Sequence, residues 1–251
     1  MPTPRRSLRI LCFGDSLTAG YSHHGAVYHP YAEVLDEKLK AAFPNTDITI
    51  LENGMPGDIV STEAFIQRLE SELDRPTFDW VIILGGTNDI GYGIEPETIL
   101  SSLEEAFATC LFKGSKVLAL TIPETHSKPG NLSARSRKQV NDGIMKQDTH
   151  GLYAFDLHAA IPYHSLSPQD KEKYWDDGLH LTPDGYDWMG RHIASALIKL
   201  IIQEVSATGA TDRRSRRMLR YAQDELLFEE EMGDPRRLHE GYVVVRLKDL
   251  N

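Results

Sequence analysis

The sequence predicts one α/β domain built as a three-layer αβα sandwich, with helices on both faces of a parallel sheet. Short apolar runs typical of strands alternate along the chain with segments of helical spacing, which is the pattern of parallel strands joined by right-handed crossovers. The size is suitable, because 251 residues with 41% hydrophobic and 25% charged residues suffice for one sizeable core. One main domain with an appendage is therefore expected.

Five apolar runs rich in β-branched residues, each bounded by Gly, Pro, Asn or Asp, predict five buried strands. These strands are expected at Arg9 to Phe13, Ile48 to Leu51, Trp80 to Leu84, Lys116 to Ile122 and Leu152 to Phe155. Apolar residues at helical spacing predict helices between the strands and after the last one. The helices are expected at Tyr31 to Phe43, Ile59 to Leu73, Pro96 to Phe112, Ser133 to Thr149 and Pro183 to Ile202.

The composition changes after residue 205, which divides the chain into a domain at 1–205 and an extension at 206–251. A basic cluster around Arg213 is followed by an acidic one around Glu230, and acidic and basic residues are equal in number within the extension. We expect an amphipathic helix at Leu219 to Phe228 and a short strand at Gly241 to Leu247. The extension either packs on the domain or docks a partner, and it is a candidate surface for homo-oligomer formation.

The charge and the two cysteines exclude several classes of function. A formal net charge of −10 disfavours a nucleic-acid partner, since such proteins gather Lys and Arg on one face. The sequence from Met1 to Arg9 lacks the apolar region of a signal peptide, and no run of about 18 apolar residues predicts membrane anchoring. Cys12 and Cys110 lie in apolar runs and are expected to be small core residues. These observations favour a soluble, cytoplasmic protein.

A serine in a glycine-containing turn directly after the first predicted strand is a candidate nucleophile. In sheets of this kind ligands bind beyond the carboxyl ends of the strands, and Ser16 follows Gly14 and Asp15 at such an end. A serine hydroxyl needs a base within hydrogen-bond reach and a third group that orients the base. Asp177 and His180, three residues apart, are suited to these two tasks.

Acyl transfer also requires hydrogen-bond donors for the negative oxygen that forms on the substrate. The candidates follow three different predicted strands and can meet at one edge of the sheet. They are the amide of Ser16, the amide of Gly57 and the side-chain amide of Asn88. Together these residues predict a serine-dependent hydrolysis of carboxylic esters.

Four sequence blocks give this arrangement a resemblance to a known family. Gly14-Asp15-Ser16-Leu17, a glycine-bearing second block, Gly86-Thr87-Asn88-Asp89 and Asp177-Gly178-Leu179-His180 resemble the four blocks of the GDSL or SGNH hydrolases, in family order. The resemblance covers about residues 9 to 203. It implies a flavodoxin-like five-stranded sheet, an acyl-serine intermediate and the hydrolysis of esters without a metal or an organic cofactor.

The resemblance also assigns roles to individual residues. It implies that Ser16 is nucleophile and oxyanion donor, that His180 is the base and that Asp177 orients it. Gly57 and Asn88 then complete the oxyanion hole. Gly54 is an alternative to Gly57 in the loosely matching second block.

The motifs leave the substrate open. Small, short-chain esters of the acetyl type are preferred, and a lysophospholipase, a thioesterase and an acyltransferase are alternatives that use the same triad. A non-catalytic binding protein that keeps the fold is an alternative from another class. Four aromatic residues near the predicted mouth either bind an acyl or sugar group or serve in packing. These are Tyr21, Tyr28, Tyr92 and Trp175.

Overall fold

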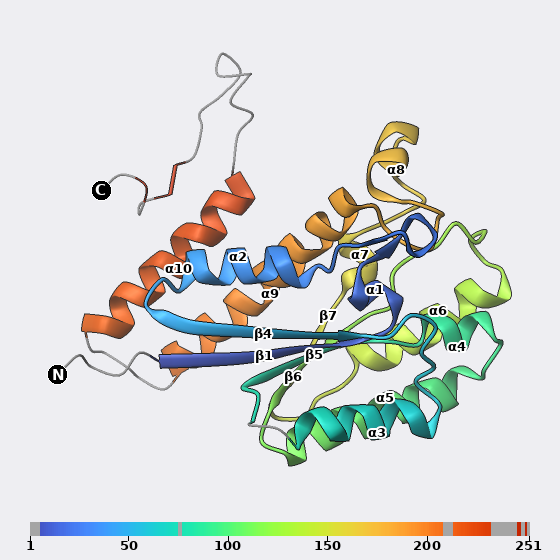
Figure 1. Cartoon of the computed structure of the whole chain (residues 1–251), viewed down its shortest axis with the longest axis horizontal. Coiled ribbons are helices and arrows are strands. Elements are labelled where there is room, and N and C mark those ends of the chain that lie inside the picture. The colour runs from blue at the N-terminus through green and yellow to red at the C-terminus, as the bar shows by residue number, and fades with distance from the viewer. Residues whose placement is uncertain (1–5, 75–76, 208–212, 232–244, 247–248, 250–251) are drawn as a thin grey trace.

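The centre of the molecule is a five-stranded parallel sheet with the strand order β4-β1-β5-β6-β7. The computed structural model describes residues 6–74, 77–207, 213–231, 245–246 and 249 (Figure 1). The sheet strands are β1 (Arg6–Gly14), β4 (Thr46–Gly54), β5 (Trp80–Leu84), β6 (Lys116–Leu120) and β7 (Leu152–Phe155). Counted along the chain, this order is the flavodoxin-like 2-1-3-4-5, so the predicted fold class is confirmed.

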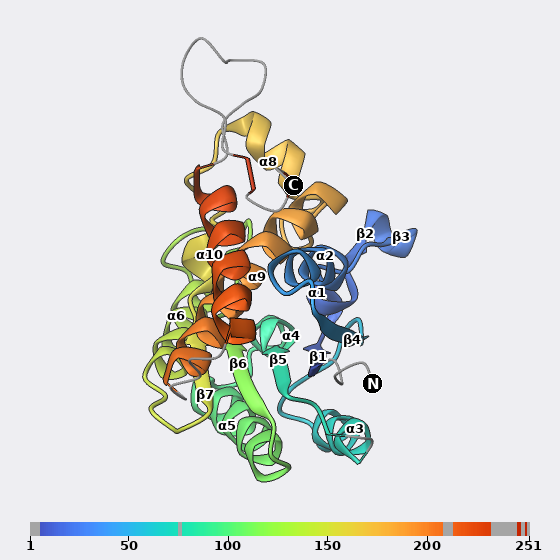
Figure 2. The same ribbon diagram turned by 90° about the vertical axis from the view of Figure 1, so that its left-hand side faces the viewer.

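Helices cover both faces of the sheet and form the outer layers of the sandwich (Figures 1 and 2). One face carries α2 (Ala32–Ala42), α7 (Leu157–Ala160) and α9 (Pro183–Ala207). The other face carries α3 (Glu63–Leu73), α5 (Pro96–Phe112) and α6 (Leu132–Met145). Short elements lie in the connections: α1 (Ser16–Ala19), a β2–β3 hairpin (Tyr21–Ser22 and Val27–Tyr28), α4 (Thr87–Gly91) and α8 (Pro168–Tyr174).

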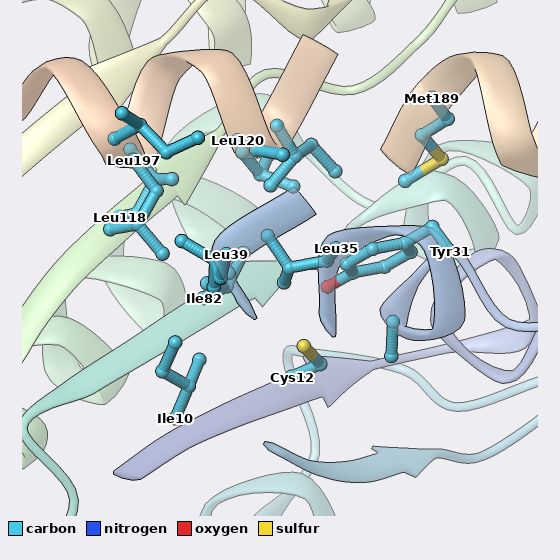
Figure 3. Packing of buried hydrophobic residues seen from close by; sticks show 14 of the residues in the cluster. Ile10, Cys12, Tyr31, Leu35, Leu39, Ile82, Leu118, Leu120, Met189 and Leu197 are labelled. Atoms are coloured by element: carbon cyan, nitrogen blue, oxygen red, sulfur yellow. The ribbon is translucent and has the colours of Figure 1, made fainter. Parts of the chain in front are cut away.

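Each face of the sheet has its own hydrophobic core, because successive residues of a strand point to opposite sides. On β1, Ile10 and Cys12 point to the first core, whereas Leu11 and Phe13 point to the second. Figure 3 shows the first core, where Leu35 and other side chains of the helices meet the strand residues. The expectation that both cysteines are core residues is confirmed, since Cys12 and Cys110 are free and buried.

The prediction of five buried strands is wrong at the two edges of the sheet. All residues of β5 are buried, but in β4 only Ile48 and in β7 only Leu152 are. An edge strand lacks a neighbour on one side, so its side chains stay partly open even when their composition is apolar.

Helices α3 and α6 each lack four residues of their predicted span at one end, for local reasons. Helix α3 begins at Glu63 instead of Ile59, because the amides of Val60 and Ser61 each donate to the carboxylate of Asp89 at 3.0 Å. Helix α6 ends at Met145 instead of Thr149, where Lys146 and Gln147 form bonds to the third residue before them. Such tighter bonds commonly close a helix.

The C-terminal extension contributes α10 (Arg213–Glu231), which includes the expected helix and packs on α2 and α9 (Figure 2). Lys38 of α2 makes ion pairs with Glu225, at 3.8 Å, and with Glu229. The expected strand at 241–247 lies outside the described residues except for Val245 and Arg246. The division at residue 205 stays a prediction. Within the described chain, no helix combines the length and apolarity needed to cross a bilayer.

Candidate active site

The three loops that carry the predicted site leave the sheet at one level. Gly14, the last residue of β1, pairs with Gly54 of β4 and with Leu84 of β5. A Cβ on Gly14 would lie 2.1 Å from the carbonyl oxygen of Leu84, so only glycine lets the strands meet this closely. The register therefore brings the loops of Ser16, Gly57 and Asn88 to the same edge of the sheet.

Ser16 begins the short helix α1 and is held by its neighbour Asp15. The Asp15 side chain caps the helix by accepting from the amide of Leu17 at 2.9 Å. The Asp15 carbonyl accepts from the amides of Thr18 and Ala19 at 3.1 Å each. The Ser16 amide has no acceptor among the described residues. Asp15 thus braces the turn, and it leaves the Ser16 amide without an intramolecular acceptor in the described chain.

Ser16, His180 and Asp177 form a continuous hydrogen-bonded chain. The Ser16 Oγ lies 3.0 Å from Nε2 of His180, and Nδ1 of the same ring lies 2.8 Å from Oδ2 of Asp177. Oδ1 of Asp177 accepts from the amides of Leu179 and His180 at 2.9 and 2.7 Å. Burial alone would raise the pKa of Asp177, but the bonds from the His180 ring and from these amides outweigh it and lower the pKa. An ionised Asp177 selects the imidazole tautomer with its hydrogen on Nδ1, so Nε2 is free to accept from Ser16.

The predicted oxyanion donors lie on two loops that contact each other. Met55 to Asp58 form a turn in which the Asp58 amide donates to the Met55 carbonyl at 3.1 Å and Gly57 has a φ of +82°. Proline before a glycine of positive φ is the pattern of a type II turn. The Gly57 amide has no acceptor within the described part of the chain. Nδ2 of Asn88 donates to the Asp58 carbonyl at 2.9 Å, which orients Asn88 and leaves its second N–H for another acceptor.

Arg68, which was not predicted from the sequence, connects the loop after β1 with the loop after β4. Its guanidinium donates to the carbonyl of Gly14 at 2.9 Å, to the carbonyl of Asn53 at 2.8 Å and to Oδ2 of Asp58 at 2.6 Å. Its guanidinium carbon Cζ lies 3.8 Å from the centre of the Phe13 ring. The only sequence clue is that Arg68 is a basic residue in a helix whose other charged residues are acidic, three positions after the apolar Phe65. The same pattern is equally typical of a solvent-exposed residue.

Three carboxylates of this region, those of Asp15, Asp58 and Asp89, have little exposure, and they are not equally satisfied. Asp58 is paired with Arg68, and Asp89 accepts from two backbone amides. Asp15 accepts from one amide, and its Oδ2 has no hydrogen-bond partner among the residues that the structure describes. Burial raises the pKa of Asp15 to about 7, and the charges of Asp58 and Asp89 add to the rise.

The aromatic residues expected at the mouth separate into different roles. Tyr21 packs on the His180 ring, with centroids 4.6 Å apart, and Tyr28 packs on Tyr21. Tyr92 is exposed after α4. Trp175 is only 4% exposed and belongs to the first core. Opposite the hairpin, the His126 amide donates to the Gly178 carbonyl at 2.6 Å and so supports the turn between Asp177 and His180.

Titratable residues give no sign of a metal centre in the part of the chain that the structure describes. No group of three or more His, Cys, Asp or Glu side chains there has a geometry that could hold an ion. The described side chains at this edge of the sheet supply a serine, an imidazole and hydrogen-bond donors.

A family model for GDSL-like lipases and acylhydrolases matches residues 12–188 of the chain. The chain belongs to the GDSL-like lipase/acylhydrolase family. The resemblance read from the four sequence blocks is confirmed, and the protein is a carboxylic ester hydrolase that acts on small-molecule esters.

Relatives of this GDSL hydrolase include an arylesterase of Vibrio mimicus. It is 29% identical over 196 residues, which cover 77% of this chain and 90% of the relative. The solved lipase/acylhydrolase of Enterococcus faecalis is 27% identical, with a TM-score of 0.59 over 76% of this chain and 95% of its own. An acetylxylan esterase of Geobacillus stearothermophilus shares the fold at 18% identity, with a TM-score of 0.62 over 74% and 92% of the two chains.

Proposed function

We propose that this hydrolase cleaves short-chain esters of the acetyl type through an acyl-enzyme on Ser16. The observation that carries the proposal is the chain of contacts from Ser16 Oγ to His180 Nε2, 3.0 Å, and from His180 Nδ1 to Asp177 Oδ2, 2.8 Å. Nucleophile, base and orienting carboxylate stand in hydrogen-bond order, as covalent catalysis by serine requires.

The first half of the reaction forms the acyl-enzyme. Ser16 Oγ attacks the ester carbonyl carbon while its proton passes to Nε2 of His180. The carbonyl oxygen becomes negative and accepts from the Ser16 amide, the Gly57 amide and Nδ2 of Asn88. The bond to the alcohol oxygen then breaks, and the proton on Nε2 passes to the departing alkoxide.

The second half releases the acid and restores the enzyme. Water gives a proton to Nε2 of His180 while its oxygen attacks the acyl carbon. The carbonyl oxygen again becomes negative and accepts from the same oxyanion donors. The bond to Ser16 Oγ breaks, the serine regains the proton, and the carboxylic acid leaves. Asp177 stays ionised throughout and stabilises the imidazolium that forms twice in the cycle.

Support for an acetyl-type acyl group comes from proteins of the same fold. Several solved structures of that fold are acetylxylan esterases of Geobacillus stearothermophilus, and their catalytic mutants replace a serine, an aspartate or a histidine. The same three residue types meet here at Ser16, Asp177 and His180.

The test measures p-nitrophenol release from acetyl, butyryl and octanoyl esters by the wild type and by Ser16→Ala. We expect turnover to fall with acyl length and to be lost in Ser16→Ala, while Ser7→Ala, at the exposed far end of β1, retains it. A faster rate on the octanoyl ester would favour a lysophospholipase or a thioesterase. New esters formed on adding an alcohol acceptor would favour an acyltransferase, and no turnover at all would favour the binding protein.

A further inference from the structure

The alcohol half and the acyl half of an ester contact different walls of the site, because His180 protonates only the alcohol oxygen. In the proposed reaction, Nε2 returns its proton to the alcohol oxygen, so that oxygen must come within hydrogen-bond reach of the imidazole. The carbon skeleton of the alcohol then extends over the side chains packed around His180. The acyl half and the oxyanion face Gly57 and Asn88 instead.

The β2–β3 hairpin supplies an aromatic wall on the His180 side. The Tyr21 ring is tilted by 49° against the imidazole, with centroids 4.6 Å apart. Tyr28 is its cross-strand partner and meets it edge-on, with centroids 5.8 Å apart. Tyr28 is 54% exposed, and Figure 2 shows the hairpin standing out beside α2. An aromatic surface thus runs from the imidazole outward to solvent.

The hairpin holds this wall at the expense of backbone strain. His23 and His24 have φ values of 51° and 55°, and non-glycine residues in that region cost on the order of 1–3 kcal/mol each. Gly25 follows with a φ of 82°, and a Cβ there would lie 2.9 Å from the Tyr21 ring. Strain of this kind persists where the surroundings fix a conformation, and it gathers at ligand sites.

Several contacts fix the hairpin to the catalytic turn and to α9. The His23 amide donates to Oδ2 of Asp176 at 2.6 Å, one residue before Asp177. The Tyr186 hydroxyl donates to the Tyr21 carbonyl at 2.8 Å. His29, just after the hairpin, lies 2.7 Å from the carboxylate of Asp187. The aromatic wall and the imidazole are therefore held in a defined relation to each other.

Given the proposed acyl transfer at Ser16, we propose that Tyr21 and Tyr28 form the subsite for the alcohol half of the ester, and that this alcohol is carried on a six-membered ring. A ring bonded to the ester oxygen extends further from the imidazole than an ethyl group does, toward the aromatic surface that Tyr21 and Tyr28 form. Aromatic side chains favour such stacked or edge-on contacts beyond simple burial. A phenol and a pyranose both have this shape.

The experiment keeps the acyl group constant and varies the alcohol. Acetate release from phenyl acetate, from an acetylated methyl xyloside and from ethyl acetate is measured as kcat/KM, which includes every step up to loss of the alcohol. Tyr28→Ala is expected to lower kcat/KM for a ring ester about fivefold more than for ethyl acetate, the size of one aromatic contact. Tyr28→Phe keeps the ring and should keep the preference. Phe112→Ala removes an 89% exposed ring at the far end of α5 and is the matched control.

The outcomes separate the subsite from the proposed function. A response confined to phenyl acetate assigns an aryl alcohol, and a response confined to the xyloside assigns a sugar. If Tyr28→Ala lowers kcat/KM equally for all three esters, or if Phe112→Ala lowers it in the same way, the proposed subsite is wrong, but the proposed acyl transfer at Ser16 is unaffected. If the wild type releases no acetate, or if Ser16→Ala releases it equally well, the proposed function fails, and the subsite fails with it.

Discussion

Arg68 gives the sharpest test of how the oxyanion hole is held in place. Replacing it with alanine removes at once the N–H groups that donate to the carbonyls of Gly14 and Asn53 and to the carboxylate of Asp58. The Asp58 side chain is only 8% exposed, so its carboxylate is left buried without a counter-charge. Breaking a buried pair in this way costs about 3–5 kcal/mol of folding free energy.

The same change should slow the reaction, because the Asp58 carbonyl also orients Asn88 and the Asp58 amide closes the Gly57 turn. A misplacement of about 1 Å in a catalytic group lowers the rate by on the order of 100-fold. The donors act on the transition state, so kcat should fall while KM changes little. Arg68→Lys keeps the charge for Asp58 but lacks the planar fork, and we expect it to recover more stability than rate.

The assay combines urea unfolding with kcat and KM for p-nitrophenyl acetate, measured for both Arg68 variants and for Arg9→Ala. Arg9 lies in the first half of β1, away from Gly14, with its guanidinium carbon 5.5 Å from the centre of the Phe78 ring, and its loss should affect stability alone. If Arg68→Ala is destabilised but retains kcat within about twofold, the reasoning that links Arg68 to the donors is refuted.

Three further changes test individual groups. Asp177→Asn should lower kcat by about ten-thousandfold without unfolding the chain, because an amide no longer selects the productive tautomer of His180; kinetics with circular dichroism checks this. Asn88→Ala should lower kcat by about 100- to 1,000-fold with little change in KM, as measured by initial rates. Asp15→Asn should change how stability depends on pH. Burial raises the pKa of Asp15 to about 7 from its ordinary value of 3.8, so the folded wild type binds the extra proton between these values. The wild type therefore loses stability relative to the variant as pH rises through that window, which urea unfolding at several pH values measures.

The parts of the fold that the sequence predicted are those encoded by local pattern. The bounds of β5, β7 and α5 follow directly from runs of apolar residues and from Pro96 at a helix start. The contact between Ser16 and His180 also followed, because both lie in recognisable turns at strand ends or before the last helix. Parallel topology then decides which turns meet.

The parts that were missed depend on contacts between distant residues. Asp89 reaches across to Val60 and Ser61 and so delays the start of α3, which no helical periodicity could reveal. The β2–β3 hairpin has strands of two residues each and a turn of strained histidines, so neither alternation nor turn preference predicts it. Such positions, where local preference gives way, are often functional.

The buried charges of Arg68 and Asp15 connect the prediction for Arg68→Ala with the prediction for Asp15→Asn. Arg68 lowers the pKa of Asp15, so at pH 8 its loss removes a counter-charge from Asp15 as well as from Asp58. Arg68→Ala should therefore cost less in the Asp15→Asn background, with a coupling on the order of 1 kcal/mol in a double-mutant cycle. At pH 5 Asp15 is protonated in the folded state, and the coupling should vanish. A coupling that is the same at both pH values would mean that packing, and not the charge on Asp15, joins the two residues.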